Sequence, residues 1–339
     1  MLWLMKVIII TIFSIILSLL LGLIIIPILK NKNNNQVLNK YLEQRHSSKS
    51  HTPTMGGIIF IIPPVFIMLI LYLFNKINIS YNLIIVLFTY ISYSLIGFID
   101  DYLIIKRNNN NGLSESLKLF FQILIATIVF YLFLSAHNEP LLWLHTLNIK
   151  INIGWLYGFF ILLVLVSSSN AVNITDGLDG LAGGLSVISL FTLAIITLNT
   201  GWLEGYKEIS FFIFSIIGSL ISFLMFNTHP AKIFMGDTGS LSLGALMGII
   251  AILTRHELLL IIVCIVFVID TLSCVIQRIY YKLTRKRIFP MTPIHHTFEQ
   301  YMTETDVVKI FWLIGLIGCL ISLLFGVWLW KNILIIMFY

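Results

Sequence analysis

Long runs of apolar residues alternate with short polar segments along the chain. Most of these runs approach or reach roughly 20 residues, the length at which an α-helix crosses a bilayer. A β-barrel is excluded, because its strands alternate apolar and polar residues. We therefore predict an all-α polytopic membrane protein with about ten transmembrane helices in a single domain, residues 1–339. The predicted spans are Val7–Leu29, Gly56–Phe74, Leu83–Ile99, Leu119–Ser135, Gly154–Ala171, Gly180–Leu198, Ile209–Phe226, Leu241–Leu253, Leu258–Ile279 and Ile310–Trp330.

Composition and charge agree with this class. Hydrophobic residues make up 58% of the chain and charged residues 11%, whereas soluble domains carry about 25% charged residues. The formal net charge of +6 is typical of Lys and Arg beside an anionic leaflet, so we expect no nucleic-acid partner. The three cysteines lie in apolar segments without a CxxC spacing, and we interpret them as packing residues.

The distribution of Lys and Arg predicts the orientation. If all ten runs cross, 15 of these residues fall on one side and six on the other. The positive-inside rule makes the first side cytoplasmic and places both termini outside. The eighth run, Leu241–Leu253, is short enough to be re-entrant. Omitting it would put the basic segment Arg278–Arg287 outside, so we keep it as a span.

Chemistry-bearing residues gather on the predicted inner side. Ten of the 15 carboxylates lie there, and only Asp270 falls inside a span. Alternate loops of a helical bundle meet over one surface, so we expect an active-site cleft on the cytoplasmic face. Five polar clusters mark inner helix ends: His46–Thr54, Asp100–Asp101, Asn170–Asp179, Asn227–Asp237 and His295–Glu299.

Two of these clusters suggest specific chemistry. Asp100 and Asp101 repel each other at a helix C-terminus, which indicates either a solvated helix end or a site where a metal ion or a proton offsets the repulsion. Asn170, Asn173, Asp176 and Asp179 recur every three residues and would share one helix face. Such amides and acids suit a ribose or uracil edge, although a capped loop would also explain them.

The other clusters leave alternatives open. Asp237 precedes a short helix in Asp-Thr-Gly-Ser, which resembles an aspartic-protease loop, but the chain has one such loop and no β-rich lobe. His295 and His296 are too close in sequence for zinc ligands at i and i+4, and they fit either surface hydrogen bonding or phosphate contact. Lys49 is either topogenic or holds an anion at the N-terminus of the next helix. A P-loop motif is absent from the sequence.

Taken in order over residues 49–299, the motifs resemble those of the phospho-N-acetylmuramoyl-pentapeptide transferase family. This family belongs to the polyprenyl-phosphate N-acetylhexosamine-1-phosphate transferase superfamily. Each motif alone is weak, and the five in order are specific. The matching segments are Thr52–Gly57, Gly97–Asp101, Asn170–Ala182, Phe234–Ser240 and Met291–Glu299.

The resemblance implies transfer of phospho-MurNAc-pentapeptide from UDP-MurNAc-pentapeptide to undecaprenyl phosphate. This reaction yields lipid I and UMP for peptidoglycan synthesis at the bacterial inner membrane. The resemblance also implies Mg²⁺ held mainly by Asp237, catalytic roles for Asp100, Asp101 and Asp237, and a homodimer as a candidate assembly. The implied substrate-binding residues are Lys49, Thr54, Lys118, Asn170, Asn173, Asp176, Asp179, Asn227, Phe234, Gln277, His295 and His296.

The sequence departs from the family pattern at two positions. Thr297 replaces the third of three consecutive histidines, and Asp270 stands where the family usually has Glu. The resemblance leaves two chemical schemes open, direct attack by the lipid phosphate or a covalent intermediate on one aspartate. Two other functions are alternatives: a sister enzyme that transfers a different amino-sugar phosphate, such as N-acetylglucosamine 1-phosphate, and a proton- or ion-coupled transporter that uses Asp270 and the loop acids.

Overall fold

The apolar runs of the sequence fold into a bundle of long helices. The computed structural model describes residues 2–31, 52–107, 112–144 and 149–328. A two-stranded antiparallel hairpin joins α4 to α5, with Leu142 opposite Ile151. The elements are α1 (Leu2–Asn31), α2 (Gly57–Leu73), α3 (Tyr81–Arg107), α4 (Glu115–Ser135), β1 (Leu141–Leu144), β2 (Ile149–Asn152), α5 (Leu156–Thr175), α6 (Leu181–Asn199), α7 (Tyr206–Asn227), α8 (Gly236–Leu253), α9 (Leu260–Val263), α10 (Ile265–Thr284), α11 (Ile294–Phe298) and α12 (Glu304–Leu323), followed by a π-helical turn (Leu324–Trp328).

The all-α polytopic membrane class is confirmed. Within the described residues, eight helices are long and apolar enough to cross a membrane, and α2 is an apolar helix of 17 residues. Large apolar side chains on the outer helices remain exposed, among them Leu4, Ile8 and Ile12 of α1. Such exposure suits contact with lipid chains, because lipid is as apolar as a protein core. The number of crossings and their orientation stay predictions.

The short eighth run forms the centre of the bundle. Helix α8 packs most extensively against α3 and α5 and also contacts α2 and α6. Gly244 and Gly248 of α8 lie against Ser168 of α5, so the two backbones approach closely. Helix α8 is therefore surrounded by protein. Its 18 residues are nearly all buried, so it has no lipid-facing surface.

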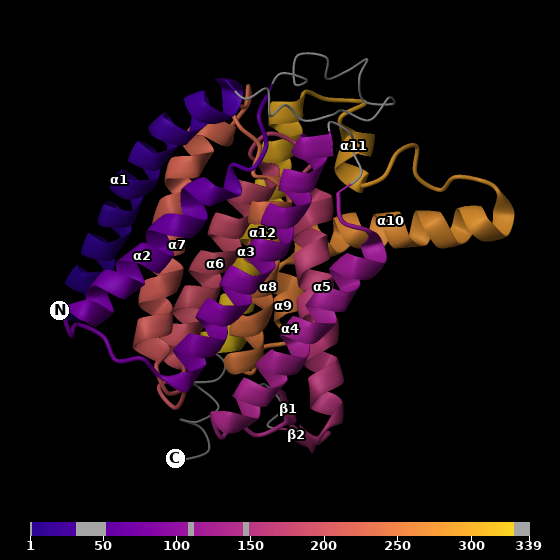
Figure 1. Ribbon diagram of the computed structural model, residues 1–339. Coiled ribbons are helices and arrows are strands. Elements are labelled where there is room, and N and C mark those ends of the chain that lie inside the picture. The colour runs from indigo at the N-terminus through magenta and orange to yellow at the C-terminus, as the bar shows by residue number, and fades with distance from the viewer. Residues whose placement is uncertain (1, 32–51, 108–111, 145–148, 329–339) are drawn as a thin grey trace.

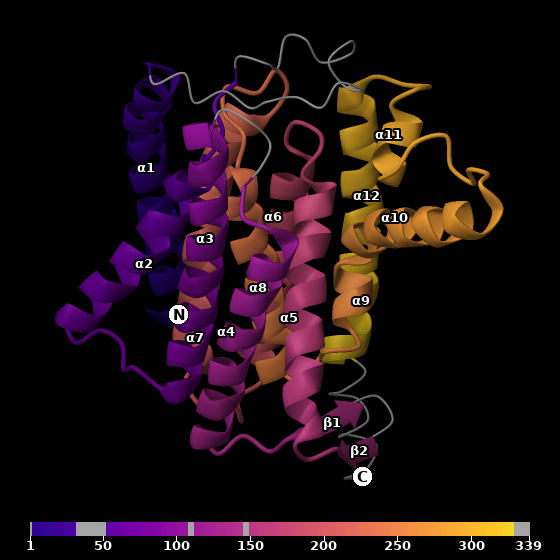
Figure 2. The same ribbon diagram turned by 45° about the vertical axis from the view of Figure 1, so that its right-hand side comes forward.

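The ninth run, Leu258–Ile279, does not form the single straight helix that we expected. The chain breaks at Cys264, and α10 then runs crosswise to the bundle and projects from it (Figures 1 and 2). Beyond Ser273 no residue of α10 is buried. Apolar content alone predicts that a helix contacts lipid, but it does not predict the direction in which the helix runs.

The two ends of the bundle differ. The β-hairpin lies at one end of the bundle (Figure 1). The α5–α6 loop, the α7–α8 loop and α11 lie at the other end, where α3 finishes and α4 begins. The polar clusters singled out in the sequence therefore share one end of the molecule.

Candidate active site at the helix ends

Three charged side chains from three helices meet at the polar end of the bundle. Lys118 of α4 places Nζ 2.8 Å from Oδ2 of Asp100 and 2.8 Å from Oδ2 of Asp237. Asp100 is 3% exposed, whereas Asp237 and Lys118 are 22% and 27% exposed. The ammonium thus links a buried carboxylate of α3 to an accessible carboxylate of α8.

Helix α5 contributes an amide to the same cluster. Nδ2 of Asn173 donates to Oδ1 of Asp237 at 2.7 Å and to Oγ of Ser240 at 2.9 Å. Four predicted site residues, Asp100, Lys118, Asn173 and Asp237, are therefore in direct contact, although they span more than a hundred positions of sequence. We call these four residues the acidic centre.

Asp101 has a different environment from its neighbour. Its Oδ1 accepts a hydrogen bond from the backbone N–H of Asp237 at 3.1 Å. Its Oδ2 accepts from the N–H of Thr238 at 2.9 Å and from Oγ1 of Thr238 at 2.5 Å. These donors form the first turn of α8, where free N–H groups attract an anion. Asp101 thus anchors α8, and this anchoring holds Asp237 in place.

Close backbone packing makes the arrangement possible. A Cβ on Gly97 of α3 would lie 2.5 Å from the backbone N of Thr238 and closer still to the carbonyl oxygen of Asp237. Only glycine allows α3 to reach the first turn of α8 at this point. Gly97 therefore permits Asp100 and Asp101 to approach Asp237.

The segment before α2 joins the α7–α8 loop. The N–H of Phe234 donates to the carbonyl of Pro53 at 2.9 Å, and the N–H of Gly56 donates back to the carbonyl of Phe234 at 2.8 Å. This pairing leaves Thr54 buried, with Oγ1 beside Gly236 and near Asp101. Thr54 and Phe234 thus lie next to the acidic centre. Lys49 falls outside the described residues.

Two predicted nucleotide contacts hold loops together. Oδ2 of Asp179 accepts from Nδ1 of His229 and from the N–H of Ala231, both at 3.0 Å. Oδ1 of Asn227 accepts from the N–H of Gly180 at 3.2 Å, and its Nδ2 donates to the carbonyl of Ile233 at 3.0 Å. Asp179 and Asn227 are buried and connect the α5–α6 loop to the α7–α8 loop.

The remaining polar residues of α5 lie along its last turns. Nδ2 of Asn170 donates to the carbonyl of Val166 in its own helix at 2.8 Å. Asp176 follows the last residue of α5, and its N–H donates to the carbonyl of Val172 at 3.1 Å. Asp176 is half-buried and the adjacent Gly177 is exposed, so this turn faces accessible space.

The third group of predicted residues lies on α10 and α11. Oε1 of Gln277 accepts from the N–H groups of Ile288 and Phe289 at 3.0 and 3.1 Å, so Gln277 holds the α10–α11 loop. His295 and His296 are buried, and their rings pack edge to face with centroids 4.3 Å apart. Both histidines lie beside Gly177. The described contacts of Gln277 do not join it to the acidic centre.

Two places in the described chain have ligands for a metal ion. Asp179, His229 and Glu304 bring one ligand atom each to within 4.8 Å of one another. These groups already bind each other and the backbone: Oε1 of Glu304 accepts from the N–H of Asp179 at 2.7 Å. Neither His229 nor Glu304 belongs to a recognised motif of the sequence, although Glu304 is among the carboxylates of the predicted inner side.

The acidic centre fits Mg²⁺ better than this second group does. Mg²⁺ prefers carboxylate and other oxygen ligands and retains several waters. Asp100 and Asp237 supply such oxygens, and the positively charged Lys118 ammonium lies between them. The second group includes an imidazole, and its carboxylates serve as loop connections.

Comparisons with known proteins agree with the fold and the motifs. Residues 83–255 match the family described as Glycosyl transferase family 4, and residues 49–61 match phospho-N-acetylmuramoyl-pentapeptide-transferase signature 1. A Staphylococcus epidermidis protein named phospho-N-acetylmuramoyl-pentapeptide-transferase is 42% identical over 320 residues, which cover 93% of this chain and 98% of the relative.

Two further relatives with the same name are similar over nearly their whole length. The Shouchella clausii protein is 41% identical over 305 residues, which cover 90% of this chain and 92% of the relative. The Bacillus licheniformis protein is 40% identical over 315 residues, which cover 92% and 95%. The resemblance inferred from the five motifs is confirmed, and the chain belongs to the phospho-N-acetylmuramoyl-pentapeptide-transferase family.

Proposed function

We propose that the chain transfers phospho-MurNAc-pentapeptide from UDP-MurNAc-pentapeptide to undecaprenyl phosphate and releases UMP. The observation that carries this proposal is the acidic centre, in which Asp100, Lys118 and Asp237 meet at one end of a membrane bundle. A water-soluble nucleotide can reach such a site from the aqueous phase, while a polyprenyl chain stays among the helices. By the positive-inside rule, this end faces the cytosol.

Charge repulsion is the first barrier to this reaction, because an anionic lipid phosphate must approach an anionic diphosphate. The Lys118 ammonium lies where it attracts both anions. Asp237 and Asp100 are the residues that would hold Mg²⁺. The ion, when bound, supplies positive charge that stabilises the diphosphate and the departing UMP. Asn173 fixes the orientation of the Asp237 carboxylate through its 2.7 Å hydrogen bond.

The two adjacent aspartates take different roles in this proposal. Asp101 uses both oxygens on the first turn of α8, so we assign it to holding Asp237. Asp100 faces Lys118 and also accepts from the N–H of Leu113 at 2.6 Å. A carboxylate with both oxygens engaged is a weak nucleophile, which favours direct attack over a covalent intermediate.

In direct attack, an oxygen of undecaprenyl phosphate forms a bond to the phosphorus that carries the sugar. The bond between that phosphorus and the bridging oxygen breaks, and the bridging oxygen leaves with UMP. Asp100 positions the Lys118 ammonium along the path of the incoming phosphate. Each bond formed is matched by one broken, and the residues of the chain are unchanged after the turnover.

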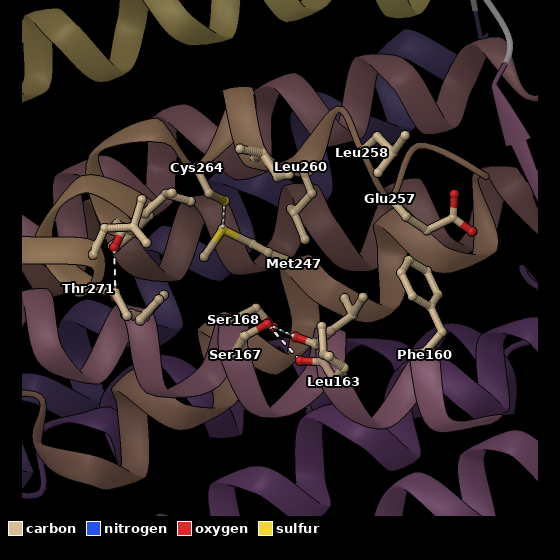
Figure 3. A pocket seen from close by; sticks show the side chains of 17 residues that line it. Phe160, Leu163, Ser167, Ser168, Met247, Glu257, Leu258, Leu260, Cys264 and Thr271 are labelled. Carbon is tan, nitrogen blue, oxygen red and sulfur yellow. Dashed lines mark hydrogen bonds between the residues drawn. The ribbon is translucent and has the colours of Figure 1, made fainter. Parts of the chain in front are cut away.

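An apolar groove along α5 suits the polyprenyl chain. It encloses about 300 Å³ between α5, α8, α9 and α10, with Phe160, Leu163, Met247 and Thr271 on its walls (Figure 3). Along α5 it extends from Phe160 to Val172, the residue before Asn173. Twelve residues of helix correspond to about 18 Å. The groove thus leads from the membrane interior toward the polar end.

Release of UMP tests the proposal. Purified protein in lipid nanodiscs should release UMP when UDP-MurNAc-pentapeptide, undecaprenyl phosphate and Mg²⁺ are all present, and a chelator should stop the release. Asp237→Asn should abolish turnover, whereas Asp306→Asn, on an exposed carboxylate of α12, should retain it. Wild-type turnover by Asp237→Asn would contradict the metal assignment.

The same assay distinguishes muramoyl transfer from the sister activity, which is transfer of N-acetylglucosamine 1-phosphate. UDP-N-acetylglucosamine replaces the muramoyl substrate in a parallel reaction, and a higher rate with it would overturn our choice of sugar. A homodimer and a site for Lys49 stay predictions.

A further inference from the structure

In both histidines of α11, the ring nitrogen Nδ1 is hydrogen-bonded to a carboxylate. Nδ1 of His295 lies 2.9 Å from Oδ2 of Asp270, and Nδ1 of His296 lies 2.9 Å from Oε2 of Glu299. Asp270 also accepts from the backbone N–H of His295 at 3.4 Å. Both Asp270 and His295 are 0% exposed. Asp270, the one carboxylate that the sequence placed inside a predicted span, is thus the partner of His295.

The carboxylate determines which ring nitrogen carries hydrogen. A carboxylate only accepts hydrogen bonds, so Nδ1 of His295 must be the donor. In the neutral imidazole the other nitrogen, Nε2, then presents a lone pair as an acceptor. Carboxylates hold imidazoles in one tautomer in this way at metal sites and in hydrolase triads.

The Nε2 atoms of the two histidines lie at the same place, beside Gly177. A Cβ on Gly177 would lie 2.5 Å from Nε2 of His295 and 3.3 Å from Nε2 of His296. Nε2 of His295 is buried and has no hydrogen-bond partner in the described part of the chain. An unpaired buried acceptor is destabilising, so such a nitrogen points to a ligand. Gly177 itself is exposed, in the turn that follows Asn173 and Asp176.

We propose that Asp270 is a positioning residue that fixes His295 so that its Nε2 accepts a hydrogen bond from the nucleotide sugar over Gly177. The proposal rests on the proposed function and names the part of the substrate that is bound. An acceptor requires an N–H or O–H group, which uracil, ribose and the acetamido sugar carry. The diphosphate oxygens are themselves acceptors, so they cannot donate to Nε2. We expect them to pair instead with the ammonium of Lys118 at the acidic centre.

Two substitutions separate this role from a structural one. His295→Asn keeps an N–H near the position of Nδ1 for Asp270 but removes Nε2. Asp270→Asn keeps the shape of the side chain but no longer dictates the tautomer. Each should raise KM for UDP-MurNAc-pentapeptide about tenfold, the effect of one lost hydrogen bond of ordinary strength. KM for undecaprenyl phosphate should stay within about twofold of wild type.

Controls make the outcome decisive. Asp270→Glu retains the acceptor and should restore KM to within about threefold of wild type, and Asp306→Asn should behave as wild type. The double variant should be no worse than either single variant, because Asp270 acts through His295. For a variant too slow to assay, calorimetry gives the Kd of the nucleotide sugar.

Wild-type UMP release is measured first, so a failure of the proposed function is recognised separately. An unchanged KM in His295→Asn would overturn the proposal, because Nε2 would then have no substrate contact. Multiplying effects in the double variant would also overturn it. A lowered melting temperature with unchanged KM would assign Asp270 to folding alone.

Discussion

Gly97→Ala tests whether the placement of Asp237 limits the rate. The added Cβ would lie 2.5 Å from the backbone N of Thr238, whereas ordinary contact begins at 3.4 Å. Both neighbours are backbone atoms of the first turn of α8, so no side chain can move aside. Helices α3 and α8 must separate by roughly 1 Å, and a displacement of that size at a reacting centre costs about 100-fold in rate.

The stability cost of the same change is moderate. Overpacking a buried contact costs about 1–3 kcal/mol, which leaves a large helical bundle folded. We therefore expect Gly97→Ala to fold but to release UMP about 100 times more slowly than wild type. Turnover and melting temperature are measured on the same nanodisc preparation, so loss of activity can be separated from unfolding.

Gly201→Ala is the matched control, because a Cβ there meets no heavy atom within 4 Å. It should retain wild-type turnover and stability. A folded Gly97→Ala variant that turns over within about threefold of wild type would refute the reasoning. In that case α3 could move away from α8 without a displacement of Asp237 that slows the reaction.

Two further predictions concern the groove and the opposite end of the bundle. Ser167→Phe fills the apolar groove and should raise KM for undecaprenyl phosphate about tenfold without changing KM for the nucleotide sugar. Leu313→Phe, on an exposed face of α12, is the control. Equal effects of the two substitutions on KM for undecaprenyl phosphate would contradict the assignment of the groove to the lipid. Burial raises the pKa of Glu257 to about 7, and hydrogen bonding to Tyr157 and the charge of Arg255 offset part of this rise. Because the unfolded carboxyl has a pKa of about 4.3, the folded state binds more protons between these values. Stability contributed by this group is fully present below the lower value and is lost as pH rises through about 7. Melting temperatures from pH 5 to 8 should therefore fall with pH in wild type and fall less in Glu257→Gln; parallel slopes would rule out Glu257 as the cause.

Much of the bundle could be predicted because apolar runs of this length have few alternatives. A chain segment in lipid must satisfy its own backbone hydrogen bonds, and a helix does so locally. The motifs also predicted a shared site, since Asp100, Lys118, Asn173 and Asp237 all lie where predicted spans end at the inner side. Their mutual contacts follow once alternate helix ends gather over one face.

The remaining features depend on packing that no local pattern encodes. Asp100 and Asp101 are adjacent and chemically identical, yet successive helical residues point about 100° apart. Only the position of α8 decides that one faces Lys118 and the other holds the first turn of α8. The break at Cys264 and the pairing of Asp270 with His295, 25 positions away, likewise arise from tertiary structure.

Lys118 acts as a built-in counterion for Asp100 and Asp237. Carboxylates gathered at a helix end would otherwise push α3 and α8 apart whenever the site is empty. With the ammonium between them, the helices are held together when no divalent ion is bound. Stripping the metal should accordingly silence the enzyme but leave it folded, with the melting temperature lowered only by the free energy of metal binding, and adding Mg²⁺ back should revive it without any refolding.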